Sequence, residues 1–168
     1  MLYCGRDDDQ RHEGVAVILE KGMKKCLMEW KPINIRLMEI RLKEKHINFT
    51  IIHCYVVTKD SEEESKDAFY YPLQAELESA SCHEMEIVMD DLKAKMGSEN
   101  TNRDIAMRKE GCGITNNSGE RLLEFFTTYD LVIRETLFPN HEIHKLTLSS
   151  PNARDKDHID HVMINGTW

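Results

Sequence analysis

The sequence predicts an α/β sandwich in a single domain. Short β-branched and apolar runs are interspersed with two segments of helical periodicity, and two of the runs follow each other closely enough to form a hairpin. The length of 168 residues suits one domain with a buried core. Because strands and helices are mixed and hairpins occur among the strands, a sandwich is favoured over a regular series of βαβ units.

Strand-like segments dominate the first third of the chain. Residues 14–19 (GVAVIL) form an apolar run after a polar, acidic start. Residues 34–42 (NIRLMEIRL) and 47–57 (INFTIIHCYVV) are β-branched and apolar with partial alternation, and the KEKH between them is typical of a turn. We therefore expect these two segments to be neighbouring antiparallel strands.

The first helix is expected after residue 60. Asp60 and Ser61 offer an N-cap, and the three glutamates that follow suit the positive end of the helix dipole. An inner face recurs every four residues, and Pro72 should kink or shorten the helix. The members of that face are Phe69, Leu73 and Leu77.

The second helix is expected to begin near Asn117–Ser118, with Glu120 placed as in a capping box. Its predicted apolar face has the spacing i, i+3, i+4, i+7. This face consists of Leu122, Phe125, Phe126 and Tyr129. Two further strands are predicted at residues 130–133 (DLVI) and 159–164 (IDHVMI).

Bulk properties limit the possible functions. The net charge of −8 argues against a protein that coats nucleic acid non-specifically, because phosphate binding relies on Lys and Arg. A nuclease is not excluded, since an acidic site can hold a divalent cation. Five dispersed cysteines without a CxxC pair indicate reduced thiols. With no signal-peptide pattern and no apolar run of about 20 residues, we expect a nuclear or cytoplasmic protein that is neither secreted nor membrane-bound.

The stretch EIVMDDLKAKMG, residues 86–97, places two carboxylates directly after a short apolar run. Neighbouring strand residues point to opposite faces, so Asp90 and Asp91 should not form a coupled pair. If Ile87 and Met89 face the core, Asp91 emerges on that inner side at the edge of the sheet, where carboxylates often serve catalysis or metal binding. The alternative is an N-cap or an Asx-turn that starts the following loop.

A second polar cluster, RDKDHIDH, precedes the last predicted strand. His158 and His161 form an HxxH pattern, as do His141 and His144, and zinc accepts His and Asp ligands. In a strand, however, residues i and i+3 point to opposite faces, so dispersed surface histidines are the alternative. Asp160 is expected to be a half-buried carboxylate that contacts a histidine or a backbone amide.

Four stretches, taken in their order and spacing, carry a resemblance to a known family. They are IIHCYVVTKDSEEESKDAFYYPLQAEL, EIVMDDLKAKMGSENTN, NSGERLLEFFTTYDLVIRETLFP and DHIDHVMI. From about Gly5 onward the chain resembles the endonuclease/exonuclease/phosphatase family, which has the DNase I-like fold. It resembles in particular the endonuclease domain of RTE-type non-LTR retrotransposons and the related craniofacial development proteins. The resemblance implies a four-layer αββα sandwich and Mg²⁺- or Mn²⁺-dependent hydrolysis of DNA phosphodiester bonds.

The resemblance assigns roles at the acidic strand end. The family has Gly-Asp-Leu-Asn at this place, so Asp91 matches the aspartate that prepares the attacking water, as general base or by positioning it. Lys93 stands where the family has an asparagine that hydrogen-bonds the phosphate. Asp90 replaces the glycine, which adds a Cβ and a negative charge at a tight turn.

Other positions match the family in part. Tyr55 aligns with a site tyrosine, Thr147 with the threonine of a Thr-Trp pair, and Asp160 with the aspartate that orients the catalytic histidine. The family's other residues are replaced at three aligned positions, which are His53 for Asn or Gln, Val57 for proline and Leu148 for tryptophan.

Two further family residues align beyond this sequence. The metal-binding glutamate lies upstream of Met1 in the alignment, and the catalytic histidine lies beyond Trp168. The resemblance therefore implies a truncated, degenerate domain that is incomplete at both termini, lacks its Mg²⁺ site and is inactive alone. DNA is its expected partner if it is active, and a protein partner is expected to cover exposed sheet edges. The alternatives are a non-catalytic interaction module and a non-functional pseudogene fragment.

Overall fold

The computed structural model describes residues 1–6, 14–56, 63–81, 83–91, 115–134, 148–149, 156–157 and 160–166. Within these ranges the side chains of residues 63–66, 90–91, 148–149 and 156–157 are not described. The chain divides into two compact units, Met1–Asp90 and Asp91–Trp168. The single domain expected from the sequence stays a prediction.

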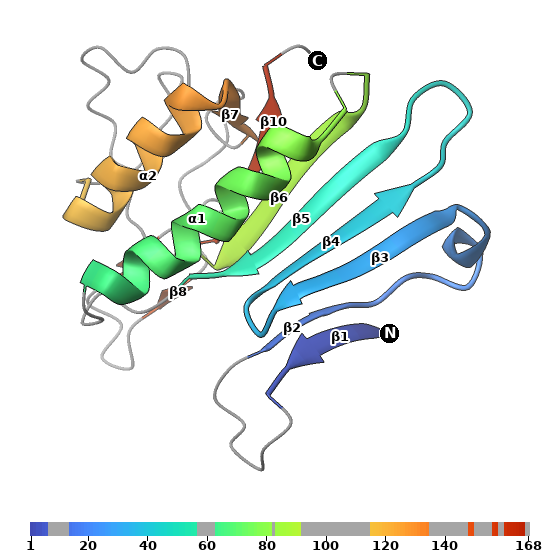
Figure 1. Cartoon of the computed structure of the whole chain (residues 1–168), viewed down its shortest axis with the longest axis horizontal. Helices are drawn as coiled ribbons and strands as arrows, with labels where there is room; N and C mark the ends of the chain where they lie inside the picture. The colour runs from blue at the N-terminus through green and yellow to red at the C-terminus, as the bar shows by residue number, and fades with distance from the viewer. Residues whose placement is uncertain are drawn as a thin grey trace. The chain divides into compact units, whose positions relative to one another are not determined.

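The first unit contains most of the strands (Figure 1). Its elements are β1 (Leu2–Gly5), β2 (Gly14–Val17), the short 3₁₀ helix η1 (Met23–Lys25), β3 (Leu27–Asn34), β4 (Leu37–Leu42), β5 (Phe49–Tyr55), α1 (Glu63–Ser79) and β6 (Met85–Asp91). The strand order in its main sheet is β3-β4-β5-β6. The predicted antiparallel pair is confirmed, because β4 and β5 pair from Leu37–Cys54 to Leu42–Phe49.

β5 and β6 run parallel, with α1 as the crossover between them. The backbone N–H of Met85, at the start of β6, donates to the carbonyl of Asn48, directly before β5, over 2.9 Å. Both strands therefore start at the same end of the sheet and finish at the other, as Figure 1 shows. A helical crossover is the usual connection between parallel strands.

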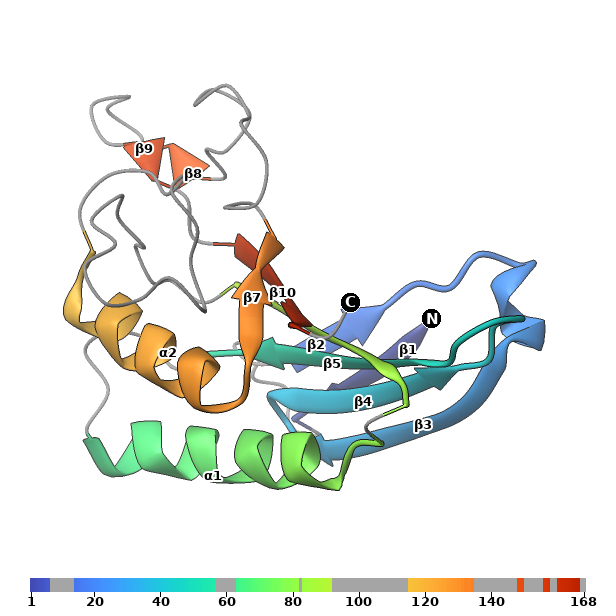
Figure 2. The same ribbon diagram turned by 90° about the horizontal axis from the view of Figure 1, so that it is seen from above.

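The two faces of this sheet are covered differently (Figure 2). The antiparallel hairpin of β1 and β2 packs on one face, where it encloses a core cluster. That cluster contains Cys4, Val15, Met38, Ile40 and Leu42. Residues that alternate with these in β4 and β5, such as Leu37 and Ile52, are fully buried on the face that α1 covers.

α1 confirms its predicted inner face. Phe69, Leu73 and Leu77 are all buried. Pro72 does not shorten the helix, which runs from Glu63 to Ser79 through the proline. Its missing N–H removes one helical hydrogen bond, and burial of the apolar face offsets that loss. The predicted N-cap residues lie outside the described part of the chain.

The second unit contains α2 (Asn117–Thr128), β7 (Leu131–Ile133), β8 (Leu148–Ser149), β9 (Lys156–Asp157) and β10 (Asp160–Asn165). β10 pairs antiparallel with β7, and β8 pairs antiparallel with β9. The predicted strands at residues 130–133 and 159–164 are therefore confirmed within one residue at each end.

Two predictions about α2 are wrong in detail. The N-cap is Asn116, whose side-chain oxygen accepts from the N–H of Gly119 over 2.8 Å, so the cap lies one residue earlier than expected. The fully buried residues are Leu122, Leu123 and Phe126. The expected Phe125 and Tyr129 are half-buried at the margin of this stripe, where their rings contact each other at 4.8 Å between centroids.

Strands β1 and β3 were not expected from the sequence. The strand predicted from residue 34 starts only at Leu37, because Asn34 turns the chain between β3 and β4. Its side-chain oxygen accepts from the N–H of Arg36 over 2.8 Å, as in an Asx-turn. β3 lies at an edge of the sheet, which accommodates Pro32 because an edge strand leaves one row of N–H groups unpaired. None of the described helices is long and apolar enough to cross a membrane.

Candidate functional site

The carboxyl ends of β5 and β6 are neighbours, because these adjacent strands run parallel. β5 ends at Tyr55 and β6 ends at Asp91. The strand predicted before the two carboxylates is therefore confirmed, with Val88 fully buried and Ile87 and Met89 half-buried. The catalytic role of Asp91 stays a prediction, and its side chain is not described.

Tyr55 lies in a well-defined local environment. Its backbone N–H donates to the carbonyl of Arg36 over 2.9 Å, and the Arg36 guanidinium carbon lies 5.2 Å from the centre of the Tyr55 ring. This cation–π contact holds the half-buried ring against β4. The arginine covers part of the ring and leaves a positive charge near the strand end.

His53 shares the strand face of Tyr55, two residues earlier. Its Nδ1 atom is buried and has no hydrogen-bond partner among the described residues. Desolvation by burial lowers the pKa of this imidazole below its ordinary value. Burial therefore favours the neutral form of His53 near pH 7.

The other predicted site residues are only partly described. Asp160 is the first residue of β10 and is exposed, so its expected half-burial is wrong. The reason is the alternation of β10, which buries His161, Met163 and Asn165 and turns Asp160 to the other side. His161 is therefore not a surface histidine, with 3% of its surface exposed. Lys93 and Thr147 lie outside the described residues, as do three histidines of the two HxxH patterns, namely His141, His144 and His158.

The described residues provide no ligand set for a metal. Across the described ranges, no group of three His, Cys, Asp or Glu side chains gathers where it could hold an ion. This applies both to the zinc alternative and to the Mg²⁺ of the family that the sequence resembles.

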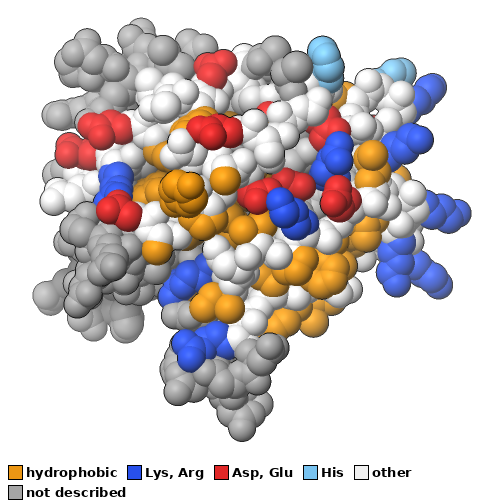
Figure 3. Space-filling model, viewed as in Figure 1, with side chains coloured by type: hydrophobic (Ala, Val, Ile, Leu, Met, Phe, Trp, Pro, Cys, Tyr) orange, Lys and Arg blue, Asp and Glu red, His pale blue; other side chains and the backbone are white. Residues whose placement is uncertain are grey.

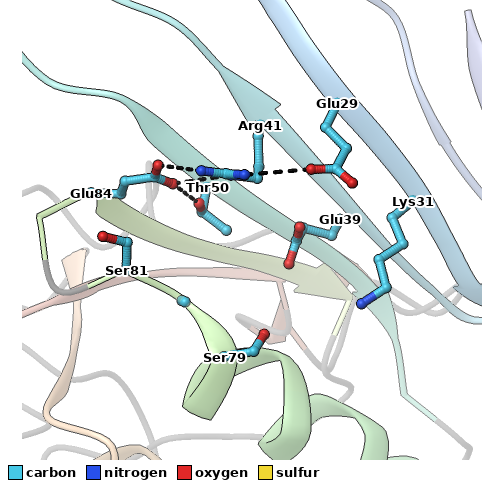
Figure 4. A pocket seen from close by; sticks show the side chains of 9 residues that line it. Glu29, Lys31, Glu39, Arg41, Thr50, Ser79, Ser81 and Glu84 are labelled. Atoms are coloured by element: carbon cyan, nitrogen blue, oxygen red, sulfur yellow. Dashed lines mark hydrogen bonds and ion pairs between the residues drawn. The ribbon is translucent and has the colours of Figure 1, made fainter.

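A polar pocket of about 240 Å³ lies on the α1 side of the sheet, and sequence reasoning missed it (Figure 4). Strands β3, β4 and β5, the end of α1 and the loop before β6 supply its walls. The residues that line it are Glu29, Lys31, Glu39, Arg41, Thr50, Ser79, Ala80, Ser81 and Glu84.

Glu84 anchors one end of this pocket. Arg41 donates to it through Nη2 at 2.5 Å and through Nε at 3.3 Å, and the Thr50 hydroxyl donates to its Oε2 atom over 2.5 Å. The Glu84 side chain is only 7% exposed. The hydrogen bond from Arg41 is the main reason that the pKa of Glu84 lies below its ordinary value. Arg41 also reaches the exposed Glu29 at 3.4 Å.

Lys31 and Glu39 line the other end of the pocket, and Lys31 pairs there with Glu76 of α1. Lys31 Nζ donates to both carboxylate oxygens of Glu76, at 2.9 and 2.7 Å, and so joins β3 to α1. Burial, followed by the charge of Glu76, raises the pKa of Glu39 above its ordinary value. Both cations of the pocket thus pair with carboxylates, and the Lys31–Glu76 pair connects β3 to α1.

A signal for this network was present in the sequence. Glu29 and Lys31 alternate in LMEWKPIN, and Glu39 and Arg41 alternate in LMEIRL. A period of two places each pair on one face of its strand. Four charged residues on one sheet face would have indicated an ion-pair layer beneath a helix.

Comparisons with known proteins agree with this fold. The chain is 32% identical over all its 168 residues to craniofacial development protein 2 from Bos taurus, and 31% identical to the protein of that name from Tragulus javanicus. It spans 28% and 29% of those two proteins, less than a third of their length. No family model matches the chain.

A solved structure gives the decisive likeness. The endonuclease domain of TRAS1, a telomere-specific non-LTR retrotransposon, superposes with a TM-score of 0.53 over 80% of this chain and 52% of that one. The chain has the DNase I-like fold. At 12% identity the superposition concerns the fold alone. The predicted fold class and the resemblance to this family are both confirmed.

Proposed function

We propose that this chain is a degenerate endonuclease domain of the retrotransposon type that does not cleave DNA by itself. In intact members of the family it resembles, Mg²⁺ or Mn²⁺ supports hydrolysis of DNA phosphodiester bonds. The observation that carries the proposal is the changed chemistry where the family's motifs align. Asp90 stands at the glycine, Lys93 at the phosphate-binding asparagine, and His53 at an Asn or Gln.

The described geometry of His53 supports this proposal. An amide at that position would present a donor and an acceptor to the strand-end edge. Burial instead favours the neutral form of His53, whose buried Nδ1 has no partner among the described residues. Its neighbour Tyr55 is held by Arg36. This part of the strand thus packs against the protein and does not present an amide to a phosphate.

The change beside Asp91 acts in the same direction. Asp90 adds a second negative charge at the carboxyl end of β6, next to the aspartate expected to prepare the attacking water. An added negative charge at this strand end raises the free energy of an approaching phosphate. A lysine at position 93 has a flexible chain and a point charge in place of an amide's fixed donors. Within the described part of the chain, Cys4 and Cys26 are reduced thiols, which supports a nuclear or cytoplasmic location as part of this proposal.

A plasmid-nicking assay tests the proposal. Purified chain is incubated with supercoiled plasmid and Mg²⁺ or Mn²⁺, and its cooperative melting is verified by circular dichroism. We expect no nicking above buffer from the folded protein, because an acid/base contribution lost at an altered motif is worth about two orders of magnitude or more. Nicking by the wild type that disappears in the Asp91→Ala variant would overturn the proposal.

A restored variant is the matched control. Asp90→Gly with Lys93→Asn returns the motif Gly-Asp-Leu-Asn to the end of β6. Recovery of nicking in this variant, and its loss on adding Asp91→Ala, would place the degeneracy at these two positions. A restored variant that melts cooperatively and stays inactive would show that further departures, such as His53, also matter.

We propose as the second candidate a non-catalytic interaction module, favoured by the exposed apolar side chains of edge strand β3. Met28 and Trp30 are 48% and 38% exposed there, and Figure 3 shows an orange band over this region. Edge strands with apolar side chains tend to pair with other chains. The measurement is sedimentation of the protein with and without Trp30→Lys. The two proteins are compared alone and with added cell extract. A monomeric wild type whose sedimentation does not change on addition of extract would argue against the module.

A further inference from the structure

Five lysines of the first unit lie in the two loops at the end of the sheet where β5 begins. Figure 3 shows blue side chains at its right edge, where Figure 1 places η1 and the loop between β4 and β5. We call this the lysine end. It consists of Lys21, Lys24, Lys25, Lys43 and Lys45, all of them exposed.

The lysine end is positive in a chain that is negative as a whole. Its two loops, residues 20–26 and 43–48, contain five lysines and two glutamates, Glu20 and Glu44, whereas the whole chain carries −8. None of the five lysines takes part in an ion pair recorded within the described part of the chain, in contrast to Lys31 and Arg41. The cluster therefore creates a local field of opposite sign to the rest of the protein.

The backbone beneath these lysines is firmly hydrogen-bonded. The N–H of Lys43 donates to the carbonyl of Cys26 over 2.7 Å, which joins the two loops. The 3₁₀ turn is closed by bonds from Met23 to Glu20 and from Cys26 to Met23, each of 3.0 Å. The lysine side chains thus project from a hydrogen-bonded backbone, so little backbone conformational entropy is lost when they bind an anion.

The composition of the lysine end selects among anionic partners. Protein interfaces favour arginine and aromatic side chains and are depleted in lysine, and neither favoured type occurs in the two loops. Insertion into a membrane surface needs large apolar side chains, whereas Met23 is the one exposed apolar residue of these loops. Nucleic-acid phosphates bind lysine as a point charge and need no other side chain.

We propose that the lysine end is a contact surface for the phosphates of duplex DNA, separate from the strand-end edge at Tyr55. The lysines adjoin the start of β5 and Tyr55 is its last residue, so about 20 Å of strand separates them. Binding here needs no cleavage and no metal. Its success or failure is therefore independent of the nicking assay.

Fluorescence anisotropy with a labelled duplex of about two helical turns tests this surface across a salt series in EDTA. We expect the logarithm of affinity to fall with the logarithm of salt concentration, at a slope of about −3.6 to −4.5 for four or five phosphate contacts. The variant Lys24→Gln/Lys25→Gln/Lys43→Gln should flatten the slope by about 2.7 and weaken low-salt binding by about tenfold or more. The variant with arginine at these three positions should bind as tightly as the wild type.

A second variant controls for net charge. Ala68→Glu/Tyr71→Glu/Ala75→Glu changes the net charge by the same amount on the exposed face of α1. It should keep the wild-type slope, and cooperative melting is checked for every variant. Equal loss in this control, an unchanged slope in the glutamine variant, or no duplex binding by wild type would overturn the proposal. Tighter binding of single-stranded RNA or of an acidic peptide than of duplex DNA would also overturn it.

Discussion

Replacing Arg41 tests whether the ion-pair layer under α1 stabilises the fold. Arg41→Met removes two hydrogen bonds to Glu84, whose side chain is 7% exposed, and leaves donors such as the Thr50 hydroxyl and the Asn48 side chain. A buried carboxylate that loses its cation costs about 3 to 5 kcal/mol. Because the Arg41 side chain is itself 32% exposed, water screens part of this pair. We therefore expect a loss of about 2 to 3 kcal/mol in the free energy of unfolding.

Glu84→Gln is the matched partner of this change. The amide oxygen can still accept from Thr50. The partly exposed Arg41 side chain remains hydrated and keeps its contact with Glu29 at 3.4 Å. We expect this variant to cost about 1 kcal/mol, clearly less than Arg41→Met. The double variant should cost less than the sum of the two, because it leaves no unpaired buried charge.

Urea unfolding followed by circular dichroism measures both changes at several pH values. The pKa of Glu84 is lowered in the folded protein, so its ion pair contributes stability above the ordinary glutamate pKa and loses it as the pH falls through the folded value. The difference between wild type and Arg41→Met should therefore shrink in acid. Equal stability of the two proteins at neutral pH, or a larger cost for Glu84→Gln, would refute this account.

Two further predictions concern single side chains. Because Asn116 caps α2, Asn116→Ala should lower the free energy of unfolding by about 1 kcal/mol, and Asn117→Ala by only a few tenths. Equal losses in thermal melts would contradict this assignment of the cap. Burial and the charge of Glu76 raise the pKa of Glu39, so the stability due to its protonated form is lost as the pH rises through the folded pKa. Glu39→Gln should therefore be more stable than wild type at neutral pH but not below the ordinary glutamate pKa, whereas Glu29→Gln should show no such gain in urea titrations.

The sequence was most informative where local periodicity and tertiary packing agree. The strands around residues 37–42 and 49–55, the face of α1 and the strand before Asp91 were all recognisable from apolar spacing. Local rules were less reliable at element ends. Asn116 and Asn117 are adjacent and chemically identical, and only the backbone conformation makes the first of them the cap. Asn34 was likewise expected to begin a strand, yet its side chain accepts from the N–H of Arg36 in the turn between β3 and β4.

At the candidate site, too, some features were predictable from the sequence and others depended on the tertiary structure. Resemblance of ordered motifs identified the fold, and the apolar pattern placed Asp91 at a strand end. The structure ends β5 at Tyr55, and the parallel course of β5 and β6 makes the two strand ends neighbours. The burial of His53 and His161 and the exposure of Asp160 did not follow from residue type. Each depends on which strand face the other elements cover.

By itself, the sequence determined the fold class, the principal strands and helices, and the altered residues at the family's motif positions. These features depend on spacing along the chain, which a single sequence contains. Only the tertiary structure decided that Lys31 and Arg41 are tied to Glu76 and Glu84, while the lysines of two separate loops lie together and exposed. Whether a charge is paired or available depends on residues far away in the sequence, and folding alone brings those residues into contact.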